Sequence, residues 1–115
     1  MVDVATKRRN MVEAQVRTSD VTDRRITAAM LGVPREDFVP MGLRDLAYID
    51  DPLAIAPGRA LMAPRTFARL LQLAAIAATD RVLIVGGLLG YSTMVVARLA
   101  GEVVTLECEA AWVEQ

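Results

Sequence analysis

Residues 82–90 read Val-Leu-Ile-Val-Gly-Gly-Leu-Leu-Gly, an apolar run typical of a buried strand that breaks into glycines. A second apolar run, Val103 to Leu106, follows and ends at Glu107. An apolar strand, a glycine-rich turn, a helix and a second strand ending in an acid occur in this order in sites for nucleotide-type cofactors. The turn would let the backbone approach a ligand, and the acid would accept hydrogen bonds from ribose hydroxyls. The stretch therefore predicts an α/β fold with a small-molecule site.

Neither the turn nor the acid is specific by itself. Residues 86–90 have the pattern Gly-Gly-x-x-Gly rather than the G-x-G-x-x-G of dinucleotide-binding enzymes, and a Gly-Gly pair after a strand is also an ordinary tight connection. Glu107 likewise has two interpretations, a ribose-binding acid or a solvated carboxylate at a strand end. The spacing leaves both open.

The composition limits the kinds of function. The chain has 115 residues, of which 54% are hydrophobic, and a formal net charge of −1, which suits one domain with a modest core. The near-neutral charge argues against a nucleic-acid partner, which usually requires a basic face. Histidine is absent and Cys108 is the single cysteine, so the sequence predicts no metal site and no intramolecular disulfide.

We expect neither a signal peptide nor a membrane partner. The N-terminal segment carries Asp3, Lys7, Arg8 and Arg9 with no apolar stretch behind them. The uncharged run from Val82 to Ala97 is shorter than the roughly 20 residues that cross a bilayer. A lone thiol suits a reducing compartment, so the sequence predicts a cytoplasmic protein.

The hydrophobic pattern predicts two helices near the N-terminus. The residues expected to be buried on them are Met11, Val12 and Val16 in the segment from Val4 to Arg17, and Ile26, Ala29, Met30 and Val33 after the capping residues 19–23. Prolines at positions 34, 40, 52 and 57 punctuate the next segment. This spacing predicts an irregular segment that wraps a core, with at most short helical turns such as Met41 to Ala47.

The second half of the chain reads as a helix followed by a β-α-β unit. Pro64 suits the first position of a helix, and its apolar face would comprise Phe67, Leu70, Leu71, Ala74 and Ala78. The strand Val82 to Val85 has no polar alternation, which is typical of a parallel strand covered on both faces. Gly90 to Ala100 would be the crossover helix, and another helix would start at Glu109 and run toward Gln115.

These elements predict one domain with two parts. Residues 1–63 would form a helical and wrapping segment, and residues 64–115 the start of a Rossmann-like domain. Two parallel strands cannot cover their own faces, so we expect exposed apolar surface and self-association through the sheet.

Three longer motifs are Met11-Val-Glu-Ala-Gln-Val-Arg17, Ala28-Ala-Met30 and Val33-Pro-Arg-Glu-Asp-Phe-Val-Pro40, followed by Arg44, Ala47-Tyr48, Asp50 and Pro52-Leu53. In order and spacing they resemble the N-terminal region of protein-L-isoaspartate O-methyltransferases. The first methyltransferase motif of that family then falls on Val82 to Tyr91 and its second-strand acid on Glu107. The proline-bounded run is the most specific of these matches.

The resemblance implies a Rossmann-like class I methyltransferase fold, here truncated after the second parallel strand, that binds S-adenosylmethionine. The residues it implies for cofactor binding are Gly86, Gly87, Gly90, Tyr91 and Glu107. The family methylates the abnormal α-carboxylate of isoaspartyl residues in damaged proteins and so starts their repair. Displacement of a sulfonium methyl by a carboxylate oxygen needs alignment and desolvation more than a strong base, so the absence of histidine is no obstacle.

Four positions depart from the family pattern. Ile84 stands where the family has an acid and Leu88 where it has the central glycine of the turn. A side chain at position 88 would take space that the cofactor needs, or strain the turn if φ is positive there. Ala60 and Met62 replace the Thr-x-Ser that includes the active-site serine, so the catalytic residue is unknown. The alternative function is a catalytically inactive methyltransferase-fold remnant that acts as a protein-interaction module.

Overall fold

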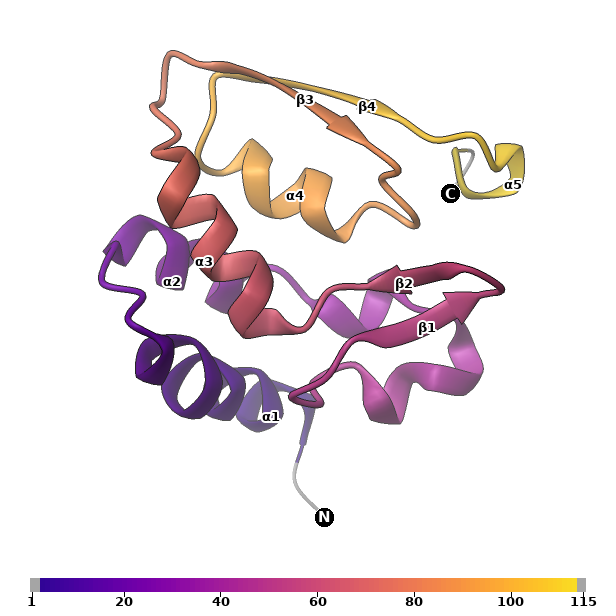
Figure 1. The fold of residues 1–115 in the computed structure, drawn as a ribbon. Coiled ribbons are helices and arrows are strands. Elements are labelled where there is room, and N and C mark those ends of the chain that lie inside the picture. The colour runs from indigo at the N-terminus through magenta and orange to yellow at the C-terminus, as the bar shows by residue number, and fades with distance from the viewer. Residues whose placement is uncertain (1–2, 114–115) are drawn as a thin grey trace.

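The structure, a computed structural model, describes residues 3–113 (Figure 1). Its N-terminal part is helical: α1 (Val4–Met11) continues through a π-helical turn (Val12–Val16) and a 3-10 turn (Arg17–Ser19), and α2 (Arg24–Gly32) follows. The carboxylates of Asp3 and Asp23 accept hydrogen bonds from the first-turn N–H groups of Thr6 and Arg25. Such N-caps satisfy donors that have no partner within the helix, which explains where both helices begin.

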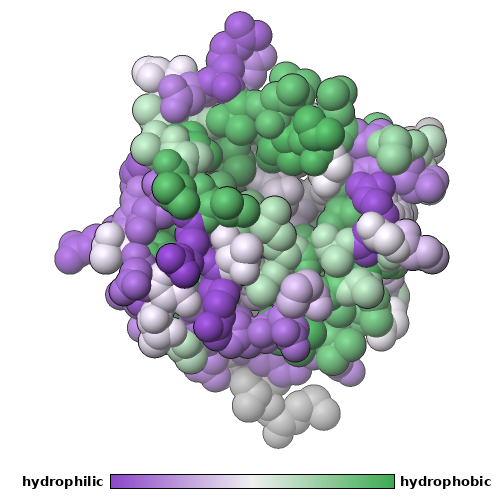
Figure 2. All heavy atoms as spheres, in the orientation of Figure 1, coloured by the Kyte–Doolittle hydropathy of each residue, from purple (hydrophilic) through white to green (hydrophobic). Residues whose placement is uncertain are grey.

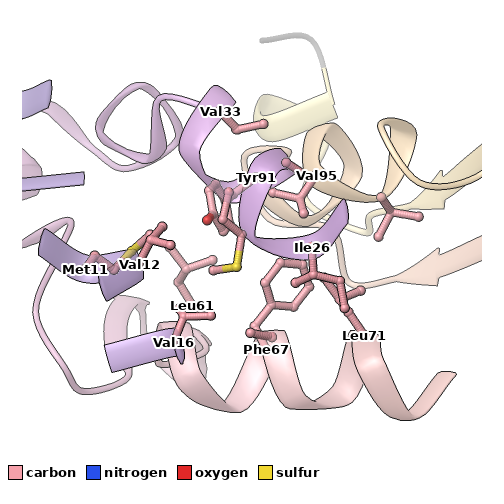
Figure 3. Packing of buried hydrophobic residues seen from close by; sticks show 14 of the residues in the cluster. Met11, Val12, Val16, Ile26, Val33, Leu61, Phe67, Leu71, Tyr91 and Val95 are labelled. Carbon is pink, nitrogen blue, oxygen red and sulfur yellow. The ribbon is translucent and has the colours of Figure 1, made fainter. Parts of the chain in front are cut away.

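The buried positions predicted on these helices are confirmed. They are Met11, Val12, Val16, Ile26, Ala29, Met30 and Val33, none of them more than 3% exposed. They join side chains of α3 (Pro64–Ala74) and α4 (Tyr91–Ala97) in one hydrophobic cluster (Figure 3). The N-terminal segment and the β-α-β unit therefore share a core.

The segment between α2 and α3 is more regular than predicted. It contains two 3-10 helices, Arg35–Phe38 and Met41–Leu46, as expected. It also contains an antiparallel hairpin of β1 (Leu53–Ala56) and β2 (Arg59–Leu61), whose turn includes Gly58 at φ +73°. The prediction of an irregular segment is wrong at this hairpin, because strands of four and three residues are too short for a period of two to stand out.

Helix α3 begins at Pro64 as predicted but ends earlier. Ala75 adopts a left-handed conformation (φ 50°) and donates its N–H to the carbonyl of Gln72, which closes the helix. Ala78 therefore lies outside the helix, and Leu70 is 47% exposed, so the predicted apolar face is confirmed only in part.

The predicted pair of parallel strands is confirmed. β3 (Arg81–Val85) pairs with β4 (Glu102–Leu106) in a parallel register that runs from Arg81 opposite Glu102 to Val85 opposite Leu106. Helix α4 is shorter than the predicted span of 90–100, since the chain turns at Arg98. A short α5 (Ala110–Val113) follows, one residue after the predicted start at Glu109, and the end of that predicted helix lies outside the described residues.

One face of this sheet packs on α4 and the other is open. In Figure 1, α4 lies between the sheet and the layer formed by α2 and α3. Leu83, Val85, Val104 and Leu106 on the opposite face are 49–76% exposed, and Figure 2 shows a hydrophobic area there. The prediction that β3 is covered on both faces is thus wrong for the described residues, whereas the predicted exposed apolar surface is confirmed. No helix within residues 3–113 combines the length and hydropathy needed to cross a membrane.

Candidate cofactor site

The turn at residues 86–90 leaves the carboxyl end of β3 and enters α4. The N–H groups of Gly86 and Gly87 point to the carbonyl of Leu106, at 2.7 and 3.4 Å, so the turn is tied to the end of β4. Gly86 and Gly90 have φ values of 76° and 106°, conformations that only glycine adopts at low cost.

Gly87 is required by packing rather than by backbone conformation. A Cβ atom at this position would lie 2.2 Å from Cγ2 of Thr105. Thr105 is itself held by a 2.7 Å hydrogen bond between its hydroxyl and that of Thr93 on α4. The close approach of the turn to β4 therefore explains why a glycine is needed at position 87, and this explanation does not involve a ligand.

Leu88 has the positive φ at which a side chain was predicted to strain the turn. Its φ is 53°, in the left-handed region that costs a residue with a side chain about 1 kcal/mol. Its N–H donates to Oε1 of Glu107 at 2.9 Å, and its half-buried side chain packs against the core. The turn therefore holds a leucine in a conformation that favours glycine.

This strain gives a test by substitution. Leu88→Gly and Leu88→Ala remove the same packing contacts, but only glycine adopts the positive φ freely. We expect Leu88→Gly to be more stable than Leu88→Ala by about 1 kcal/mol in urea unfolding, the reverse of the usual order of the two residues. An alanine variant as stable as the glycine variant would show that φ is not positive at this position.

Glu107 is surrounded by donors. Its Oε1 accepts from Nη2 of Arg59 at 2.5 Å in addition to the Leu88 N–H, and its Oε2 accepts from Nη1 of Arg59 at 3.1 Å and from the N–H of Glu109 at 2.8 Å. The carboxylate side chain is only 3% exposed. The guanidinium of Arg59 also stacks over the ring of Trp112, 5.0 Å from its centroid. The interpretation of Glu107 as a solvated carboxylate is therefore wrong.

These bonds change the acidity of Glu107. The hydrogen bonds from Arg59, followed by the N–H of Glu109, lower the pKa of the Glu107 carboxyl to about 2. Glu107 is therefore an anion throughout the physiological pH range.

The lowered pKa predicts an acid-dependent loss of stability. The ordinary pKa of the Glu107 carboxyl is 4.5, so its ionised form adds stability that is complete above about pH 4.5 and disappears as the pH falls toward 2. We expect Glu107→Gln to be less stable than the wild type at neutral pH, and the difference to vanish near pH 2. Urea unfolding of both proteins across this range measures it. A difference that stays constant below pH 4.5 would contradict the ion pair.

Two cavities flank the turn, and Leu88 lines both. The first, of about 330 Å³, is bordered by Gly87, Gly90, Glu107 and Trp112 and lies at the carboxyl ends of β3 and β4. Its volume is at the lower end of the range of small-molecule sites. The structure thus brings three of the five predicted site residues to one cavity.

Gly86 and Tyr91, the other two predicted site residues, line the second cavity, of about 390 Å³, which extends along β3. Tyr91 is 1% exposed, and its ring packs at tilted angles against Phe38 and Phe67, at centroid distances of 6.3 and 5.8 Å. In Figure 3 Tyr91 lies among the packed side chains of α2 and α3. Tyr91 is therefore first of all a core residue.

Arg35 also borders the second cavity, and no local sequence pattern marks it as a site residue. It is 1% exposed, and it donates from Nε to the carbonyl of Ala47 (2.5 Å) and from Nη2 to that of Met62 (2.9 Å). Its guanidinium carbon lies 4.7 Å from the centroid of the Tyr91 ring. Burial lowers the pKa of Arg35, and the neighbouring Tyr91 partly opposes this. The side chain ties three segments of the chain together.

A buried network lies beside Arg35. The hydroxyl of Tyr48 donates to Glu36 and accepts from Nε of Arg8 at 2.9 Å and from the backbone N–H of Arg35 at 3.1 Å. Burial and then the bond to Glu36 raise the pKa of Tyr48 to about 12. The network fixes the Pro-Arg-Glu stretch against α1, which is a structural role.

The positions of the family's Thr-x-Ser carry no hydroxyl in this chain. Ala60 is exposed and Met62 is 45% exposed; both line the second cavity, and the carbonyl of Met62 accepts a hydrogen bond from Arg35. No group of three or more metal-ligating side chains lies together in the part of the chain that the structure describes.

Comparisons with known proteins identify the family of the chain. The sequence model of the family described as "Protein-L-isoaspartate(D-aspartate) O-methyltransferase (PCMT)" matches residues 6–114. The chain is 45% identical over 104 residues to protein-L-isoaspartate O-methyltransferase 2 of Anaeromyxobacter sp. (strain Fw109-5), covering 90% of this chain and 43% of that protein. It is 39% identical over 114 residues to the protein-L-isoaspartate O-methyltransferase of Roseiflexus sp. (strain RS-1), covering 99% and 52%.

Solved structures have the same fold. A protein-L-isoaspartate O-methyltransferase matches with a TM-score of 0.76 at 26% identity, over 93% of this chain and 36% of its own. A putative protein-L-isoaspartate O-methyltransferase from Plasmodium falciparum, in complex with S-adenosyl-L-homocysteine, matches with a TM-score of 0.76 at 23% identity, over 93% and 51%. The chain spans about half the length of the curated relatives it matches. With its Rossmann-like α/β fold, the chain belongs to the protein-L-isoaspartate(D-aspartate) O-methyltransferase family.

Proposed function

We propose that this chain provides the cofactor-binding part of an S-adenosylmethionine-dependent methyltransferase that acts on isoaspartyl carboxylates of damaged proteins. The observation that carries the proposal is the convergence of Gly87, Gly90 and Glu107 on one cavity at the carboxyl ends of two parallel strands. This edge is where open α/β sheets bind their ligands. Family membership and the complex of the Plasmodium falciparum neighbour with S-adenosyl-L-homocysteine support it.

The residues fit such a cofactor with one rearrangement. Gly87 and Gly90 would leave room for the ligand beside the backbone, and Glu107 would accept hydrogen bonds from the ribose hydroxyls. Gly86 and Tyr91 would approach the ligand from the second cavity. The rearrangement concerns the side chain of Arg59, which now bonds to Glu107.

Bound S-adenosylmethionine supplies a methyl group on a sulfonium centre. The contribution of the chain would be to align that group and to exclude water, which are the main requirements of a methyl displacement. We assign no catalytic residue, since Ala60 and Met62 offer no hydroxyl.

A transfer assay tests the reaction. Labelled S-adenosylmethionine is incubated with the protein and an isoaspartyl peptide, and with the same peptide containing a normal aspartyl residue as control. We expect label only in the isoaspartyl peptide. Label in neither peptide, or equal label in both, would contradict the proposal.

A double substitution tests the two departures from the family motif. Leu88→Gly combined with Ile84→Glu is expected to raise affinity for the cofactor, because it removes a side chain that lines both cavities and introduces an acid where the family has one. The dissociation constant from calorimetry measures this. An unchanged constant would show that these positions do not weaken the site.

A second candidate function rests on the open face of the β3–β4 sheet. Its four exposed apolar side chains, at positions 83, 85, 104 and 106, suit an interface with a second copy of the chain. Sedimentation would then give a dimer that Val85→Lys converts to a monomer. A monomer at all concentrations would remove this candidate.

A further inference from the structure

The guanidinium of Arg59 lies where a ribose-bearing ligand would meet this site. It forms a two-pronged ion pair with Glu107, with Nη···Oε distances of 2.5 and 3.1 Å. It also stands over the turn, because a Cβ atom at Gly86 would lie 3.5 Å from Nη2 of Arg59. One side chain thus covers both the acid and the start of the glycine turn.

We propose that Arg59 competes with the cofactor ribose for Glu107 and thereby sets the affinity of the site. This inference rests on the proposed function, since it concerns the same ligand and the same acid. Binding then requires the Arg59 side chain to leave before the ribose hydroxyls can bond to the carboxylate.

Counting hydrogen-bond acceptors supports competition rather than simultaneous binding. An ionised carboxylate offers about four acceptor positions, and Glu107 already receives four donors. Two of them, the N–H groups of Leu88 and Glu109, belong to the backbone. The two from Arg59 belong to a flexible side chain that is 28% exposed, so they are the donors that a ligand can replace.

The position of Arg59 in the fold allows it to withdraw. It is the first residue of β2, directly after the positive-φ Gly58 of the hairpin turn, and its side chain is 28% exposed. Its other partners are the face of the Trp112 ring and, at 3.7 Å, the sulfur of Cys108. Both are weak contacts compared with the ion pair.

Arg59→Gln tests the proposal, with Arg65→Gln as matched control. Arg65 forms an exposed ion pair with Asp50, away from Glu107, so the control makes the same chemical change outside the site. The probe is S-adenosyl-L-homocysteine, titrated by calorimetry. We expect Arg59→Gln to bind it roughly tenfold more tightly than the wild type, and Arg65→Gln to bind it as tightly as the wild type. The reason is that the apparent affinity falls when Arg59 is bonded to Glu107 in most molecules.

A second readout follows Arg59 itself. Trp112 is the only tryptophan, so its fluorescence reports on the guanidinium that covers its ring. Addition of S-adenosyl-L-homocysteine should change this emission in the wild type more than in Arg59→Gln.

Arg59→Lys keeps the charge but cannot form the two-pronged pair, so it should bind S-adenosyl-L-homocysteine with an affinity between those of the wild type and Arg59→Gln. It replaces Arg59→Gln in the test if that variant does not fold.

The outcomes separate this inference from the proposed function. Equal affinities in wild type and Arg59→Gln, with binding present, overturn the role of Arg59 and leave the cofactor site intact. Absence of binding in the wild type and in both Arg59 variants overturns the cofactor site and the inference together.

Discussion

Tyr91→Ala is expected to lower the free energy of unfolding by about 4 kcal/mol. Tyr91 is 1% exposed, and its ring contacts the rings of Phe38 and Phe67 and the guanidinium of Arg35. Removal of the ring would leave a cavity in the cluster that joins the N-terminal helices to α4. The effect is large because these packed elements cannot collapse fully around the lost volume.

Tyr91→Phe is the matched control. The hydroxyl of Tyr91 has no hydrogen-bond partner among the described residues, so its removal should change the stability by less than about 1 kcal/mol. Urea unfolding of both variants makes the comparison, and Tyr91→Leu provides an intermediate case if the alanine variant is unfolded in water. A loss in Tyr91→Phe as large as in Tyr91→Ala would mean that the hydroxyl, rather than the ring, stabilises the core.

Gly101→Ala should cost about 2 kcal/mol, because a Cβ atom at this position would lie 2.7 Å from the carbonyl oxygen of Ala78. The obstacle is backbone and cannot rotate away. The N–H groups of Gly101 and Glu102 also both donate to the carbonyl of Asp80, at 2.9 and 3.1 Å, which fixes the entry into β4.

Gly42→Ala is the control, since no atom beyond its two chain neighbours lies within 4 Å of a Cβ at Gly42. Its stability in urea should stay within about 0.5 kcal/mol of the wild type. If Gly101→Ala were as stable in urea as Gly42→Ala, the close approach of residues 78 and 101 would be disproved.

Much of the fold was predictable because short-range patterns in the sequence indicate its helices and strands. The apolar runs at 82–85 and 103–106 and the glycines between them predicted the parallel β-α-β unit that the structure contains. The three- and four-residue spacing of Ile26, Ala29 and Met30 predicted which side of α2 is buried. Periodicity records which face of an element meets the core, so it reveals such elements when they are long enough.

The hairpin and the end of α3 were missed for different reasons. The strands of the hairpin are too short to show alternation, although Pro57-Gly58 is a turn signal. The end of α3 depends on Ala75 in a left-handed conformation, which alanine seldom adopts. An alanine at this position therefore gives no sign in the sequence that the helix ends there.

The candidate site was predictable only in its local parts. The acid and the turn are close in sequence, and the structure brings Glu107 to the N–H of Leu88 at 2.9 Å. The partner of Glu107, however, is 48 residues away, and nothing in the surroundings of Arg59 distinguishes it from the other arginines of the chain. Pairings between distant segments are set by tertiary packing, which local patterns do not record.

We propose that the turn at 86–90 and Glu107 together form the binding site of an adenosine-containing cofactor. The most direct test is a two-dimensional amide NMR spectrum of the protein recorded without and with excess S-adenosylmethionine. We expect shifts that concentrate on Gly86, Gly87, Gly90 and Glu107, while the amides of α1 stay in place. A well-dispersed spectrum in which none of these resonances moves would contradict it.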